Sequence, residues 1–113
     1  MSYFWKTFED GTTIGTIGSE GGKIIKDEEN TFGARVTLEG KGSVAPASIT
    51  LGIYGLMFHT DFFGSIEEGM DCLELFKARI EKLIAHYLIA EKDRGDKWEK
   101  RHDDLIEEIV SKV

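Results

Sequence analysis

The pattern of hydrophobic and polar residues along the chain changes at Ser65. Before this residue, glycine, threonine and aromatic residues occur in short alternating runs, a pattern typical of β-strands and turns. After it, leucine, isoleucine and charged residues recur at steps of three and four, which is the period of an amphipathic helix. The order of the two patterns predicts an α+β fold, in which an antiparallel sheet comes first and is packed by C-terminal helices.

The clearest strand pattern lies between residues 32 and 39. The side chains expected to face the core are Phe32, Ala34, Val36 and Leu38, and those expected to face solvent or a site are Gly33, Arg35, Thr37 and Glu39. A second alternation follows Pro46 and places on the core face Ala47, Ile49, Leu51 and Ile53. Because Gly55 suits a bulge, bend or tight turn, residues 56–63 are expected to form a further strand or a bent continuation.

The N-terminal region predicts a hairpin. Residues 3–9 are rich in aromatic side chains and end at Asp10-Gly11, a pair that favours a type I′ turn, so residues 12–18 are expected to return as a second strand. A hairpin loop at residues 18–22 then leads to a short run at residues 23–26, which is followed by a polar turn at residues 27–30. We therefore expect an antiparallel meander of roughly four to six strands over residues 3–63.

Two helices are predicted after the sheet. Ser65 and Glu68 form a capping-box pattern at the start of a long helix over about residues 66–93. Its apolar stripe, expected to lie on the sheet, consists of Ile66, Met70, Leu73, Phe76, Ile80, Leu83, Ile84, Tyr87 and Leu88. Gly95 is expected to end this region as a left-handed residue, before a shorter helix over about residues 97–112. One helix from residue 66 to 112 would be about 70 Å long, which is too long for a small globular domain.

Composition favours a single domain over residues 1–113, with enough apolar residues for a core. The formal net charge is −7, and acidic residues outnumber basic ones on both sides of Ser65. This balance argues against nucleic acid and against an anionic membrane surface as partners, because both are recognised through Lys and Arg. It is compatible with a basic protein partner, and it is equally explained by solubility alone.

The sequence predicts a cytoplasmic location. It has no apolar run of the roughly 20 residues that a membrane helix needs, and its start does not resemble a signal peptide. The one cysteine, Cys72, cannot form an internal disulfide and has acidic sequence neighbours, so we interpret it as an inert side chain beside the helix core.

His59 and Asp61 are the strongest candidates for chemistry. Two residues apart in a strand, they point to the same face, where a carboxylate can orient an imidazole that acts as a base. Arg35 and Tyr54 would share that face only if Gly55 introduced a bulge. The sequence places no nucleophile beside this pair, and a histidine near the end of an edge strand explains the same residues.

Metal and phosphate motifs are weak, so we expect no metal and no cofactor. The three histidines are not at ligand spacings, and the acidic run at residues 27–29 lacks the pattern of a calcium loop. The glycine-rich loop at residues 18–22 lacks the Lys-Ser/Thr ending of a phosphate loop and contains Glu20, which would repel an anion.

Surplus aromatic residues suggest binding. Alternation cannot bury all of the large side chains of the first and last strands, which are Tyr3, Phe4, Trp5, Phe8, Met57, Phe58, Phe62 and Phe63. Our leading hypothesis is a small acidic protein that binds another protein, either as an inhibitor of the immunity-protein kind or by self-association. The candidate binding residues are Tyr54, Met57, His59, Phe63 and Trp98. The alternative is a small-ligand-binding or hydrolytic domain that uses His59 and Asp61 in a cleft between sheet and helix, and a homodimer through the last helix or an edge strand is a third possibility.

Overall fold

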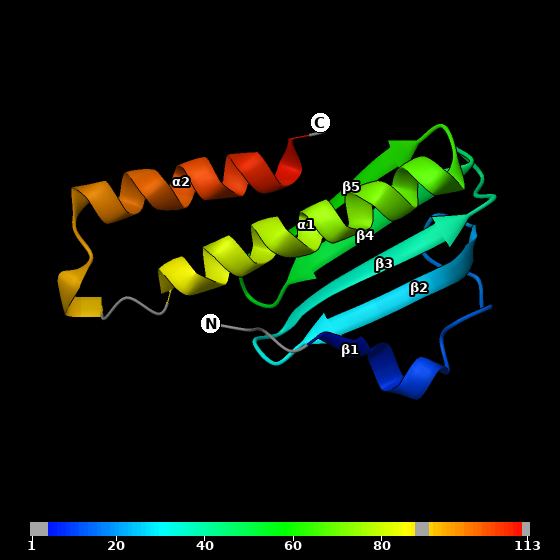
Figure 1. Ribbon diagram of the computed structural model, residues 1–113, viewed down its shortest axis with the longest axis horizontal. Helices are drawn as coiled ribbons and strands as arrows, with labels where there is room; N and C mark the ends of the chain where they lie inside the picture. The colour runs from blue at the N-terminus through cyan, green and yellow to red at the C-terminus, as the bar shows by residue number, and fades with distance from the viewer. Residues whose placement is uncertain (1–4, 88–90, 112–113) are drawn as a thin grey trace. The chain divides into compact units, whose positions relative to one another are not determined.

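The computed structural model describes residues 5–87 and 91–111 and has an α+β fold (Figure 1). The strands are β1 (Trp5–Thr7), β2 (Lys23–Asn30), β3 (Ala34–Gly40), β4 (Ala47–Ile53) and β5 (Met57–Phe63). They form one sheet in the order β1-β2-β3-β4-β5, and each neighbouring pair is antiparallel. The helices are α1 (Ile66–Tyr87) and α2 (Asp96–Val110), with the short 3-10 segments η1 (Phe8–Gly11) and η2 (Glu91–Asp93). The predicted antiparallel meander and the two helices are therefore confirmed.

The chain divides into two compact units, Met1–Glu74 and Leu75–Val113. The first contains the whole sheet and the first turns of α1, and the second contains the rest of α1 together with α2. The single domain expected over residues 1–113 stays a prediction.

One face of the sheet forms the core of the first unit. The alternating residues Ala34, Val36 and Leu38 are fully buried, and β4 aligns its own buried set with them, pairing Val36 with Leu51. The first turns of α1 lie directly on this face, because a Cβ added to Gly69 would come within 2.9 Å of Leu38 Cδ1. The period-two pattern thus correctly predicted the apolar core face of β3 and β4, whereas Thr37, Glu39 and Ser48 on the other face are also buried.

Phe32 is an exception, because it is 48% exposed instead of buried. The carboxamide of Asn30 accepts hydrogen bonds from the backbone N–H groups of Phe32 and Ala34, at 3.0 and 3.1 Å. This side-chain-to-backbone turn places Phe32 before the strand, which begins at Ala34.

The start of α1 follows the predicted cap, whereas the region near Gly95 does not. The Ser65 hydroxyl accepts a hydrogen bond from the Glu68 backbone N–H at 3.1 Å, as a capping box requires. Gly95 has φ −122°, so the predicted left-handed conformation is wrong. Its carbonyl instead accepts the Glu99 backbone N–H at 3.0 Å, and Gly95 precedes the first turn of α2. Residues 88–90, which the predicted long helix included, lie outside the described residues.

The predicted N-terminal hairpin is wrong. Glu9 and Asp10 adopt a tight left-handed turn, with φ 46° and 56°, but residues 12–18 do not return as a strand beside β1. They continue along the edge of β2, where the Ile24 N–H donates to the Thr16 carbonyl at 2.9 Å. Strand β1 pairs only with residues 28–30 at the C-terminal end of β2. The N-terminal part of that edge of β2 is therefore available to residues 12–18. Tyr3 and Phe4 lie outside the described residues.

The glycine-rich loop at residues 18–22 surrounds a carboxylate of the chain itself. Glu39 is only 1% exposed, and its Oε1 accepts backbone N–H groups of Glu20 and Gly22, both at 3.1 Å. A Cβ on Gly18 would lie 2.4 Å from the Glu39 carboxyl carbon. Successive backbone N–H groups in such loops bind anions, and here the bound anion is an internal side chain.

We predict that Gly18→Ala lowers the free energy of unfolding by about 1–3 kcal/mol, because the methyl group displaces Glu39 from its hydrogen bonds. Urea denaturation measures the change. The matched control is Gly64→Ala, where the added Cβ would make an ordinary 3.6 Å contact with Glu68 Oε2. Equal losses in the two variants would contradict the role of Glu39.

Candidate functional site

The sheet face opposite the first turns of α1 carries a row of polar and aromatic side chains, which we call the open face. Its members follow from the strand register, which aligns Arg35 with Gly52 and Gly52 with Phe58. A neighbouring row aligns Thr37, Thr50 and Thr60. Directly opposed residues of an antiparallel pair share a face, so these side chains form one surface.

A buried carboxylate organises the part of the open face on β2 and β3. Both oxygens of Asp27 accept hydrogen bonds from Arg35, from Nε at 2.8 Å and from Nη2 at 2.6 Å. Two hydroxyl groups complete the set, from Thr13 at 2.8 Å and from Thr37 at 3.1 Å. The guanidinium of Arg35 also lies over the ring of Phe8, 3.6 Å from its centroid, which is a cation–π contact. Arg35 is therefore held rigidly on the open face.

These contacts set the pKa of Asp27. Burial by itself would raise it, but the hydrogen bonds from Arg35, Thr13 and Thr37 and the positive charge of Arg35 lower the pKa below its ordinary value of 3.8. Asp27 is thus an ionised carboxylate in the folded chain at neutral pH, although its side chain is fully buried.

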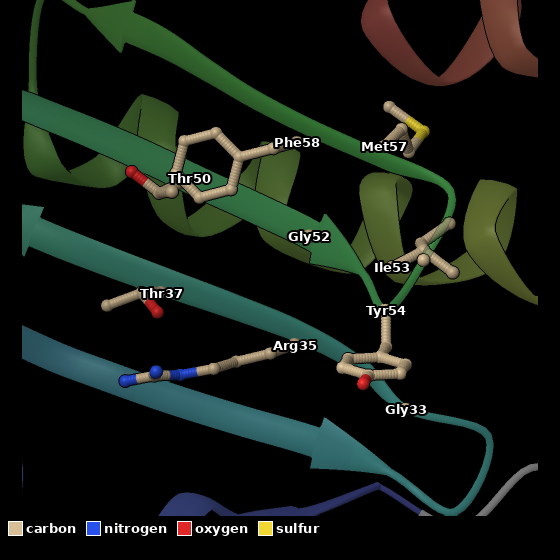
Figure 2. A pocket seen from close by; sticks show the side chains of 10 residues that line it. Gly33, Arg35, Thr37, Thr50, Gly52, Ile53, Tyr54, Met57 and Phe58 are labelled. Carbon is tan, nitrogen blue, oxygen red and sulfur yellow. The ribbon is translucent and has the colours of Figure 1, made fainter.

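Beside Arg35 lies an open hollow of about 360 Å³, lined by residues of β3, β4 and β5 and of the two turns at that end of the sheet (Figure 2). Its floor is low because Gly52 has no side chain between Arg35 and Phe58. Tyr54 and Phe58 flank it, and they are 92% and 74% exposed. The hollow thus combines two exposed aromatic rings with the fixed guanidinium.

The turn that carries Tyr54 is tight. The Leu56 N–H donates to the Ile53 carbonyl at 2.9 Å, and Gly55 has φ +74°, a conformation that glycine adopts without strain. The further strand predicted after Gly55 is confirmed as β5. No register shift occurs between β4 and β5, so Gly55 does not introduce a bulge into their ladder.

His59 and Asp61 lie on the core face rather than the open face. The register aligns His59 with Leu51 and Asp61 with Ile49. The two side chains share a face, as predicted, with His59 Nε2 3.2 Å from Asp61 Oδ1. The distance suits an ion pair, but His59 Nε2 and Asp61 Oδ2 are buried without an aligned hydrogen bond. The suggestion that Arg35 shares this face is wrong.

Thr60, the residue between His59 and Asp61, is not placed beside them as a nucleophile. Thr60 points to the open face, where its hydroxyl lies 3.1 Å from that of Thr50. Neither His59 nor Asp61 lines the hollow described above. Within the described residues, no group of three or more His, Cys, Asp or Glu side chains could hold a metal ion.

The other predicted binding residues have different surroundings. Tyr54 and Met57 line the hollow. Phe63 is 2% exposed and belongs to the core of the first unit, so it does not offer an open binding surface. Trp98 is buried in the second unit, where its ring stacks on His86 at a centroid distance of 4.5 Å and its Nε1 donates to the His86 carbonyl.

Sequence reasoning missed the pairing of Arg35 with Asp27. The polar turn predicted at residues 27–30 is wrong, because these residues belong to β2 and Asp27 is buried. Alternation had placed Arg35 on the polar side of its strand, which was correct, but the strand before it does not alternate regularly. A register irregularity between Ile24 and Lys26 shifts the phase of β2, so the position of Asp27 opposite Thr37 could not be counted from the sequence.

No family model, no curated protein and no solved structure matches this chain. Among the described helices, none is long and apolar enough to cross a membrane. The function is therefore inferred from the surface of the chain itself.

We predict that Asp27→Asn lowers the free energy of unfolding by roughly 2–3 kcal/mol at pH 7, because it removes a charge-assisted pair and leaves Arg35 without its partner. The native carboxyl has a lowered pKa, so its contribution is complete above the unfolded value of 3.8 and is lost as the pH falls below it. The difference between the two proteins should therefore shrink below pH 3.8.

Urea denaturation at several pH values measures this difference. The matched control is Asp71→Asn, which changes an exposed carboxylate and should have a small effect at every pH. A difference for Asp27→Asn that does not change with pH would contradict the lowered pKa.

Proposed function

We propose that this chain is a binding protein without catalytic activity, and that another protein docks on its open face at the hollow. The observation that carries the proposal is the exposure of Tyr54 and Phe58 on either side of this hollow. Aromatic residues and arginine dominate the energetically important positions of protein interfaces, and here Arg35 lines the same hollow as the two rings.

The form of the hollow favours a protein over a small molecule. Sites for small ligands usually enclose most of the ligand surface. This hollow lies on one face of a sheet and is bounded by two side chains that are largely exposed, so it suits a side chain that projects from a larger surface. The hollow includes neither His59 nor Asp61, so it does not support the hydrolytic alternative. That alternative stays a prediction.

Charge suggests the chemistry of the partner. Arg35 is neutralised by Asp27, and its hydrogen bonds to Asp27 together with the charges of Asp27, Glu9 and Glu29 raise its pKa above the ordinary value. Acidic groups thus lie near Arg35, on a chain whose net charge is −7. We expect a partner with an apolar or aromatic side chain for the hollow and with Lys or Arg residues around it, as an acidic inhibitor of the immunity-protein kind would require. A cytoplasmic location, which the single Cys72 supports, belongs to the same proposal.

We predict that Tyr54→Ala and Phe58→Ala each weaken partner binding by about 10- to 30-fold, because each removes an anchoring ring. The wild-type chain, immobilised, is used to capture proteins from an extract of the source cells. Captured proteins are then purified and titrated by interferometry against each variant, and increasing salt should weaken binding to a basic partner.

The matched controls are Ile17→Ala and Val44→Ala, which remove apolar side chains of comparable exposure, 71% and 73%, from outside the hollow. Circular dichroism checks that all four variants remain folded, as expected for exposed side chains. Captured proteins that bind the hollow variants and the controls equally well would overturn the proposal.

A further inference from the structure

Strand β5 leaves one edge of the sheet unpaired. Among the described residues its neighbour in the sheet is β4 alone, and it lies at the opposite end of the strand order from β1 (Figure 1). Its seven residues pair with β4 without a register shift. Lys, Pro, bulges and short length protect many edge strands, and Met57–Phe63 has none of these. It does carry Asp61 on its core face, and such a charge opposes a second strand unless that strand brings an opposite partner. The edge is therefore suited to accept another strand in a register that pairs Asp61 with an opposite charge.

The sequence of β5, MFHTDFF, is complementary to itself when it is reversed about its middle residue. In an antiparallel pair of two copies centred on Thr60, each His59 lies opposite Asp61 of the second copy. Phe58 lies opposite Phe62, and Met57 opposite Phe63. All seven residues overlap, and the two-fold axis produces each cross-strand pair twice.

Charge distinguishes this register from its neighbours. A pair centred on Asp61 would place two carboxylates directly opposite one another, and a pair centred on His59 would do the same with two imidazoles. Both shifts also shorten the overlap of the strands. A parallel pair would align every residue with its own copy, so opposite charges meet only in the antiparallel register centred on Thr60.

The side chains of β5 also suit this arrangement. His59 Nε2 and Asp61 Oδ2 are buried on the core face without an aligned hydrogen bond, and the second copy would supply each with an opposite partner. Phe58, which is largely exposed, lies on the open face, where it would meet the ring of Phe62 across the axis. Opposite charges and aromatic pairs are the cross-strand combinations that stabilise antiparallel sheets.

We infer that two copies of this chain pair through β5, antiparallel and centred on Thr60, so that their sheets join into one continuous sheet. Backbone hydrogen bonds along the edge supply the affinity, and the His59–Asp61 pairs fix the register. The inference goes beyond the proposed docking of another protein and does not depend on it. The two surfaces share Phe58, but the dimer forms along the edge of the sheet, whereas Tyr54 of the hollow lies outside β5.

Disulfide trapping tests the register. In a Cys72→Ser background, Thr60→Cys places two thiols directly opposite one another, where the roughly 4.5–5.5 Å between Cα atoms lies within the range of a disulfide. The matched control, Phe58→Cys, would place its two thiols about 13 Å apart along the strands, beyond the reach of a disulfide. We expect mild oxidation to convert most of the first variant, but little of the second, into covalent dimer. Equal cross-linking, or none in the Thr60 variant, would overturn the register.

Charge exchange tests the pairing without a cross-link. Light scattering over a range of concentrations should give a dimer for the wild-type chain. His59→Asp and Asp61→His should each weaken the dimer about tenfold or more, because like groups then face each other twice, and the double exchange should restore it. A wild-type chain that remains monomeric at every concentration would overturn the inference, as would a double variant no better than the single ones.

One variant separates this inference from the proposed function. Tyr54 lies in the turn beside the hollow and outside β5, so Tyr54→Ala should leave the dimer unchanged while it weakens docking of another protein. Circular dichroism confirms that each variant is folded before its mass is measured. A loss of dimer in Tyr54→Ala would show that the face, and not the edge, joins the copies.

Discussion

Asp27 is the carboxylate on which the arrangement of the open face depends. It is buried, and an ionised carboxylate without partners would destabilise the fold. Its four hydrogen bonds come from two other segments of the chain, since Arg35 and Thr37 belong to β3 and Thr13 to the segment beside η1, whereas Asp27 itself belongs to β2. One buried charge therefore joins the N-terminal segment to the sheet and fixes the guanidinium beside the hollow.

Glu39 has a similar role near the end of β3. Its carboxylate accepts backbone N–H groups of the glycine-rich loop, which orders a segment that has few apolar side chains of its own. The first unit is thus stabilised in two ways. Apolar side chains pack on the face that the first turns of α1 cover, and buried carboxylates hold irregular segments against the other face. The segments held by these buried carboxylates cover part of the open face, and the rest of that face stays exposed.

Sequence reasoning succeeded where local interactions decide the structure, and it failed where the structure depends on residues distant in sequence. Alternation in β3 and β4 predicted which apolar side chains face the core because the period of a strand is a local property, and Ser65 marked the start of α1 for the same reason. The path of residues 12–18 depends on contacts with Asp27 and Glu39, which are distant in sequence, so the local turn signal at Asp10-Gly11 was misleading. The conformation of Gly95 was likewise decided by the helix that follows it.

The candidate site was predicted in the same partial way. Period two correctly placed His59 and Asp61 on one face, but which face this is depends on the pairing of β5 with β4. The tight turn at Gly55 keeps the register regular, which separates His59 from Arg35 and brings Phe58 next to the hollow. The aromatic surplus of this strand was visible in the sequence, whereas the fixed position of Arg35 required the pairing with Asp27.

The hollow also depends on an absent side chain. Gly52 occupies an ordinary strand position between Arg35 and Phe58, and a Cβ there would make only a normal contact of 3.5 Å with the Phe58 ring. A larger residue would therefore replace the depression with a ridge while the backbone stayed as it is. The shape that this face offers to a partner can thus change through one substitution, so that recognition can evolve separately from the stability of the fold.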